Sequence, residues 1–136
     1  MQFLNRTDLL SLIDEATLTT ISDNNTVYID ESEARAIDEM TAYINSRYDI
    51  LKVFDTEQPR NNLVVMYLCD ILLYHLHARI MPDNIPELRV KRYDTAIQWL
   101  DKVADGFITP MLPKNEDPTK TQIRSGNSSE KQDQYY

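Results

Sequence analysis

Glycine is almost absent from this chain of 136 residues, which contains only Gly106 and Gly126. A glycine-rich loop that binds phosphate through its backbone N–H groups therefore has no place in the sequence. The single cysteine, Cys69, excludes an internal disulfide, and its place in the most apolar stretch predicts a buried, inert thiol. A hydrophobic core of ordinary size must therefore stabilise the fold.

Basic residues are also scarce, since 14 Lys and Arg face 22 Asp and Glu and the net charge is −8. The imbalance lies in residues 1–50, which hold ten acidic and three basic side chains. Tight binding of nucleic acid needs clustered Lys and Arg to contact phosphates, so DNA is not expected as a tightly held ligand. An acidic surface is instead suited to remaining soluble, or to letting DNA pass without being held.

Apolar residues recur at steps of three and four, the spacing of one helix face, over most of residues 1–106. Thr7 or Asp8 can cap a first short helix. A second short helix is expected over Glu15–Ile21. The pattern predicts one mainly α-helical domain, residues 1–106, built as a small bundle of four to five helices.

The middle of the chain combines polar breaks with a strong helical stripe. After the break at residues 22–25, residues 27–29 are expected to be a short extended piece. A firm helix is expected to begin at Asp30 or Ser32, with its apolar residues on one face. Residues 49–58 are expected to form a loop before the next helix.

The helix that begins after Asn61 or Asn62 is apolar almost all round and is expected to lie at the centre of the bundle. It contains Asp70 near its middle, and a carboxylate there costs about 2.5–3.5 kcal/mol on membrane insertion. We therefore expect a buried core helix and no membrane. A last helix should begin near Pro86 and end at Gly106.

Residues 107–136 differ from the rest, because they contain half of the six prolines and little that could build a core. We expect this C-terminal segment to be an extended arm that takes its shape from a partner. Thr121, Ile123 and Arg124 belong to a short strip that could add a strand to a partner's sheet. Tyr135 and Tyr136 could serve as aromatic anchors.

No catalytic set can be assembled from the sequence. His75 and His77 are two positions apart on a helix, so they point in nearly opposite directions and cannot share a metal ion. The carboxylates of residues 8–39 are typical of a solvated face. We expect no enzyme activity, no metal and no cofactor, and an unrecognised hydrolase that uses His75 or His77 is the more distant alternative.

Arg89, Lys91 and Arg92 form the densest basic cluster. One interpretation is a solvated outer face. The other is a contact with the acidic N-terminal half of a neighbouring subunit, for which the matching side chains are Glu31, Glu33 and Asp38. Three cations with one adjacent aromatic are too few to predict nucleic-acid binding.

Three ordered segments resemble a known family. Residues 3–9 (Phe-Leu-Asn-Arg-Thr-Asp-Leu) are similar to the start of small phage head–tail connector proteins. Residues 42–48 (Ala-Tyr-Ile-Asn-Ser-Arg-Tyr) resemble the end of that family's long second helix. Residues 92–100 (Arg-Tyr-Asp-Thr-Ala-Ile-Gln-Trp-Leu), closing at Gly106, resemble its final helix. The layout is similar to the Mu-like prophage connectors and related adaptors of long-tailed phages.

This resemblance implies a structural protein of the phage neck with no catalytic residues. Its members form a ring, often of about twelve copies, beneath the portal protein. The implied partners are other copies of the chain, the portal and the next neck or tail protein, with DNA only passing through the channel. The implied location is the virion, after synthesis in the host cytoplasm. An acidic cytosolic interaction module, such as an inhibitor that mimics DNA, is the alternative.

Overall fold

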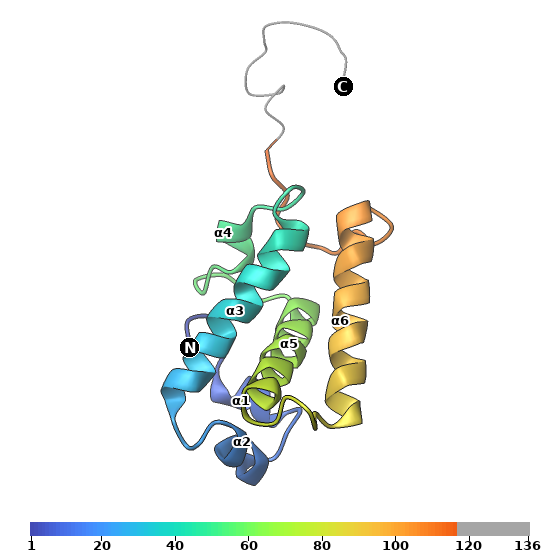
Figure 1. The fold of residues 1–136 in the computed structure, drawn as a ribbon. Coiled ribbons are helices and arrows are strands. Elements are labelled where there is room, and N and C mark those ends of the chain that lie inside the picture. Colours follow the sequence, from blue (N-terminus) through green and yellow to red (C-terminus); the bar gives the residue numbers. More distant parts are fainter. Residues whose placement is uncertain (117–136) are drawn as a thin grey trace, which may run out of the picture.

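The computed structural model describes residues 1–116, and within them the chain is all-α (Figure 1). The residues expected to dock on a partner, Thr121, Ile123, Arg124, Tyr135 and Tyr136, lie outside the described part. The helices are α1 (Arg6–Leu10), α2 (Glu15–Ile21), α3 (Thr26–Ile44), α4 (Ile50–Val53), α5 (Asn62–Ile80) and α6 (Glu87–Asp105). The prediction of a small helical bundle is confirmed.

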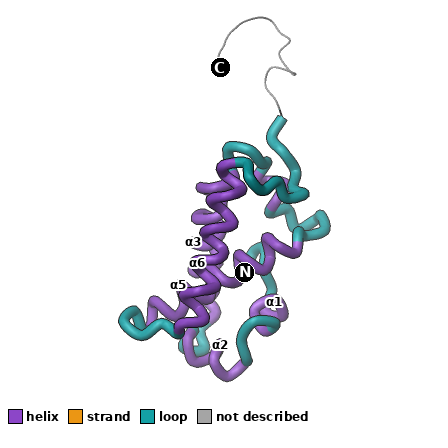
Figure 2. The backbone as a smooth tube through the Cα atoms, turned by 90° about the vertical axis from the view of Figure 1, so that its right-hand side faces the viewer, coloured by secondary structure: helices purple, strands orange, loops and turns teal. Residues whose placement is uncertain are grey.

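The three long helices α3, α5 and α6 contact one another, and the short helices α1 and α2 pack against α5 (Figures 1 and 2). Every one of these helices therefore touches α5. Its buried side chains include Leu68, Ile71, Leu72 and Leu76, which have no exposed surface. Full burial of each such side chain contributes about 1.5–3 kcal/mol, so α5 is the centre of the core as the sequence predicts.

Among the described helices, α5 alone is long and apolar enough to cross a membrane. Half of the apolar stretch that meets this criterion is buried inside the fold. Asp70 and His77, both on α5, are also buried against neighbouring helices. These features are those of the core helix of a bundle, because a lipid-facing helix would present its apolar side chains outward.

Side-chain caps decide where the helices begin. Asn61 caps α5 as one of the two expected residues, accepting hydrogen bonds from the N–H groups of Leu63 and Val64. Asn5, and neither Thr7 nor Asp8, caps α1, and Asp8 completes the capping box by accepting from the Asn5 N–H.

Two local expectations are wrong. Residues 27–29 are helical, because Asn25 caps α3 through a hydrogen bond from the Val27 N–H and the helix begins at Thr26. The expected loop at residues 49–58 contains the short helix α4, which Asp49 caps. The first polar cap starts α3 earlier than the apolar periodicity indicates. The second starts a short helix where the periodicity indicates none.

Candidate docking site

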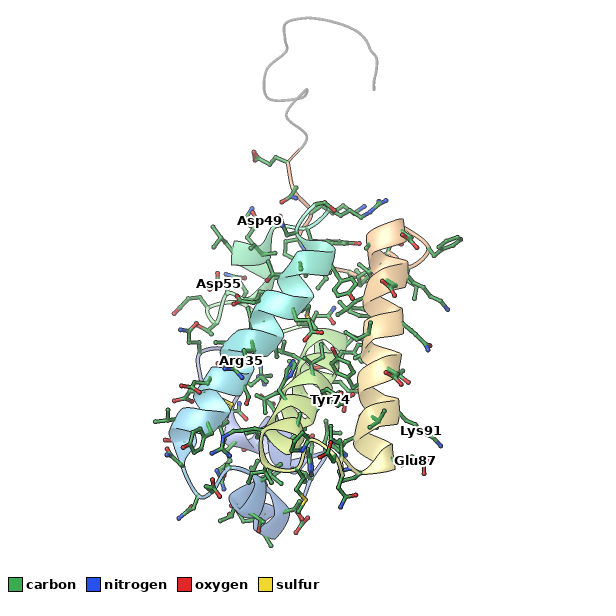
Figure 3. The ribbon with its side chains drawn as sticks, viewed as in Figure 1. Arg35, Asp49, Asp55, Tyr74, Glu87 and Lys91 are labelled. Atoms are coloured by element: carbon green, nitrogen blue, oxygen red, sulfur yellow. The ribbon has the colours of Figure 1, made fainter. Side chains whose placement is uncertain are left out.

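Charged residues expected at a subunit interface fall into two groups. Glu31, Asp38 and Lys91 are exposed on the outer surface. Lys91 pairs with Glu87 one helical turn away, with 3.2 Å between Nζ and Oε2, and Figure 3 shows both at the start of α6. Their exposure leaves these three residues available to a neighbouring molecule, and their interface role stays a prediction.

Glu33 belongs to the second group, because it is turned inward and is 2% exposed. Its carboxylate accepts hydrogen bonds from the backbone N–H groups of Gln2 (2.6 Å), Phe3 (3.0 Å) and Leu4 (2.7 Å). A buried carboxylate needs such partners to offset its desolvation. Glu33 therefore holds the N-terminal residues onto α3 and does not present a charge to a neighbour, which corrects the expectation.

Arg89 and Arg92 are likewise engaged within the chain. Arg92 forms two hydrogen bonds with the buried Asp70, from Nε to Oδ1 (2.7 Å) and from Nη2 to Oδ2 (3.2 Å). Burial nevertheless raises the pKa of Asp70 above its ordinary value. Arg89 is 6% exposed and donates from Nη2 to the Leu12 carbonyl (3.3 Å). Arg89 is thus not a surface cation, whereas the Arg92 side chain pairs with Asp70 and stays 33% exposed. A carboxylate inside an apolar helix is the sequence signal that an arginine partner is needed.

The C-terminal segment does not leave the body at residue 107. Leu112 is 8% exposed and belongs to the core. Pro113 accepts a hydrogen bond from the Asp49 N–H (2.9 Å), and the Asn115 N–H donates to the Arg47 carbonyl (3.1 Å). Leu112 and these hydrogen bonds thus attach residues 107–115 to the chain's own helices, so the folded body continues past Gly106.

Arg47, which follows α3, connects this part of the chain to the end of α6 and to the C-terminal segment. Its Nε donates to the Ala104 carbonyl at the end of α6 (3.0 Å), and its own carbonyl accepts from Asn115. Its guanidinium also lies against Gly106, the left-handed residue (φ +85°) that ends α6. We call this part of the molecule, formed by residues 45–63 and 104–116, the exit end.

The exit end carries a groove of about 620 Å³. Its lining comes from α4 and the following loop, from the approach to α5, and from the C-terminal segment: Lys52, Val53, Asp55, residues 58–61 and residues 111–113. Figure 3 shows Asp49 and Asp55 beside α4, at the opposite end of the molecule from Lys91. We call this feature the end groove.

Large apolar side chains are also exposed at the exit end. Leu51 is 83% exposed, Phe107 84% and Met111 94%, and Leu63 at the start of α5 is 43% exposed. Single exposed apolar residues are normal on a protein surface, but several at one end beside a groove mark an interaction site. Periodicity counts Leu63 and Phe107 with the apolar faces of their helices, although both are exposed here. It gives no signal for Leu51 and Met111, because a one-turn helix and a loop carry no repeating pattern.

The comparisons with known proteins agree with this chain being a phage component. The sequence matches the family described as Bacteriophage Mu, Gp36, over residues 3–127. The chain belongs to the Bacteriophage Mu Gp36 family. None of the curated proteins matches it. The match takes in all six helices and the exit end of this Gp36-family protein, and it reaches residues beyond the described part.

The candidate chemical groups of this Gp36-family protein lie in separate surroundings. His75 faces Glu39, with 2.8 Å between Nε2 and Oε1, whereas His77 is 7% exposed and burial lowers its pKa. Burial raises the pKa of the Cys69 thiol to about 12, as expected of an inert thiol. Residues 1–116 contain no group of three His, Cys, Asp or Glu placed to hold a metal ion.

Proposed function

We propose that this phage protein is a head–tail connector of the virion neck, which forms an oligomeric ring between the portal and the tail and leaves a channel for DNA. Its Gp36 family membership supports a phage component, and the resemblance of residues 3–107 to connector proteins supports the neck. The observation that carries the docking role is the exit end, where Leu51 and Leu63 stand exposed.

In this proposal the helical bundle presents the exit end toward the portal. Residues 117–136 continue from this end, so docking by Thr121, Ile123 and Arg124, and by Tyr135 and Tyr136, would use the same side of the ring. Exposed apolar groups gathered at one end of a molecule are typical of surfaces that bind by burying aromatic and aliphatic anchors. The portal partner, the copy number of about twelve and the virion location are parts of this proposal.

The channel face is proposed to be the outer side of α3. Asp30, Glu31 and Asp38 are exposed there, with Arg35 among them. Negative charge on the wall repels the phosphates of passing DNA, so the duplex would slide through without being held. The exposed acidic residues would then face the channel, and the ring contacts would lie elsewhere on the molecule.

Truncation after Glu116 tests the docking role. The truncated protein should keep its helical circular dichroism spectrum, because the described bundle ends there. Its affinity for purified portal protein should fall at least about tenfold, which corresponds to about 1.4 kcal/mol. Unchanged portal binding would remove residues 117–136 from the docking mechanism, and full-length protein is the control.

The location is tested by electron microscopy of intact particles with the protein labelled. Label at the neck is the expected result, and particles that carry the label elsewhere or not at all contradict the proposal. Light scattering distinguishes the proposed ring component from the alternative, an acidic inhibitor. The inhibitor would stay a monomer or dimer and bind a basic target strongly at low salt. A ring component instead forms larger oligomers, alone or with the portal.

A further inference from the structure

We propose that neighbouring subunits join by inserting Phe107 of one copy into the end groove of the next. This inference rests on the proposed ring and identifies the surfaces that close it. A ring of identical subunits needs two different, complementary patches on separate flanks of the molecule. The exit end provides one protruding aromatic side chain and one apolar groove.

Phe107 is the protruding group. It is 84% exposed, although it directly follows a well-ordered helix end. Its N–H donates to the Lys102 carbonyl (2.9 Å), as does the N–H of Ile108 (3.2 Å), and Gly106 supplies the left-handed turn. These bonds hold the backbone so that the phenyl ring of Phe107 stays outside the core of its own subunit. With its backbone fixed, Phe107 has only two side-chain torsions to order on binding, so little entropy is lost.

The end groove is the receiving surface. Val53 and Leu112 form apolar walls, and Pro59 and Pro113 add rigid ones. The volume of about 620 Å³ accommodates an aromatic side chain with its flanking backbone. Met111 lines the groove and is 94% exposed, and its unbranched thioether can pack over an inserted ring.

The two patches lie on different sides of the molecule. In Figure 1 the turn after α6 stands at the right edge and α4 at the left, and the groove is lined by α4 and the loop after it together with residues 111–113. One copy can therefore offer its aromatic group to a neighbour on one side while its groove receives another neighbour on the opposite side. That head-to-tail arrangement closes into a ring when the rotation between copies is a full turn divided by a whole number, with no shift along the axis.

Charge placement is complementary as well. Phe107 is flanked by the exposed Lys102 and Asp105, and the end groove by Lys52 and Asp55. The groove lining also includes Arg60, but Arg60 pairs with Asp8 inside the chain, so Lys52 and Asp55 are the charges left to meet a neighbour. With Phe107 inserted, Asp105 can face Lys52 of the next copy while Lys102 faces Asp55. Rim charges of this kind set the register of two surfaces and suppress wrong partners.

Cysteine cross-linking tests the contact on the full-length protein. Thr109→Cys places a thiol two residues after Phe107, and Gln58→Cys places one at the groove; both positions are exposed, and the native Cys69 is buried. Under mild oxidation, a mixture of the two variants should give disulfide-linked dimers, and either variant alone should give few. Adding Phe107→Ala to the Thr109→Cys variant should lower the yield at least about tenfold.

Leu88→Cys mixed with Gln58→Cys is the matched control, because Leu88 is 60% exposed at the far end of α6 and should not cross-link. Two results would overturn the inference. One is efficient cross-linking of a single variant to itself, and the other is cross-linking of Gln58→Cys to portal protein and not to Thr109→Cys. Light scattering of the wild-type protein is measured alongside. If the protein forms oligomers but gives no cross-links, this contact is wrong and the proposed ring stands. If it stays monomeric, both alone and with portal protein, and gives no cross-links, the contact and the ring are both wrong.

Discussion

At the scale of single residues, the fold depends on a few buried charges that are matched within the chain. Glu33 and Asp70 are each less than one-tenth exposed. Removing a charged group from water is costly unless hydrogen bonds or an opposite charge replace the solvent. The N-terminal amides satisfy Glu33, and Arg92 pairs with Asp70. These charges therefore position segments of the bundle and leave assembly to other residues.

The pair of Asp8 and Arg60 gives a prediction for pH. Two hydrogen bonds join them, from Nη1 to Oδ2 (2.6 Å) and from Nη2 to Oδ1 (3.1 Å), and the Asn5 N–H also donates to Asp8 (2.8 Å). Burial by itself would raise the pKa of Asp8, but the Arg60 and Asn5 hydrogen bonds and the Arg60 charge lower it. The stabilisation is therefore present above the unfolded pKa of about 3.9 and is lost as pH falls through the lower folded pKa.

Asp8→Asn should lower the free energy of unfolding by about 1–3 kcal/mol at pH 7. The difference from wild type should shrink as the pH falls below about 4, because the wild-type carboxyl then gains its proton. Urea unfolding at several pH values measures both effects. Asp38→Asn, at an exposed position, is the control and should change stability by less than about 0.5 kcal/mol. A pH-independent difference would show that Asp8 acts by shape alone.

At the scale of elements, the ends of the helices do more than the helix interiors to shape the exit end. Arg47, just beyond α3, bonds to the last turn of α6 and to Asn115. The Asn115 side chain adds a hydrogen bond to the Asn45 carbonyl (2.8 Å). One short stretch thereby fixes where α6 stops and where the chain departs.

Gly106→Ala should destabilise the protein by about 1–2 kcal/mol, because φ is +85° and an L side chain is strained there. The added Cβ would also lie 3.0 Å from Nη2 of Arg47. Thermal unfolding of Gly106→Ala, Arg47→Ala and the double variant separates the two causes. A smaller cost of the glycine change in the Arg47→Ala background indicates crowding by the guanidinium, and an equal cost indicates backbone strain. A neutral Gly106→Ala would contradict both.

At the scale of the whole molecule, the folded body extends past Gly106 to at least residue 115. The sequence predicts its boundary at Gly106, because the prolines and polar residues that follow lack helical periodicity. Leu112 and the hydrogen bonds of residues 113–115 nevertheless attach this part to the bundle. The expectation of an arm that starts at residue 107 is therefore corrected for residues 107–115.

Two truncations measure this boundary. A chain ending at Gly106 should unfold with a free energy at least about 2 kcal/mol below that of a chain ending at Glu116, since it loses the burial of Leu112 and several hydrogen bonds. Urea unfolding followed by circular dichroism gives the difference. Leu112→Ala in the longer chain isolates the apolar part. Equal stability of the two truncated chains would return the boundary to Gly106.

Local chemistry was enough to predict the parts of the fold that short stretches of chain decide. Asn61 starts α5, Gly106 ends α6, and Glu15–Ile21 is a helix with the bounds that its pattern indicates. The helix at residues 27–29 was missed because a β-branched and aromatic triplet favours strands, and tertiary packing of Ile29 overrides that preference. Glu33 was misplaced because a carboxylate on a helix is normally solvated.

The amino-acid sequence by itself determined the all-α class, the central position of α5 and most helix ends, because periodicity and capping act over a few residues. Tertiary structure alone decided which charges turn inward, where residues 107–115 return to the bundle, and that Phe107 and the end groove share one end. Those features join residues far apart in the chain. Partners for a buried charge or a groove wall are set by three-dimensional packing, which local spacing does not encode.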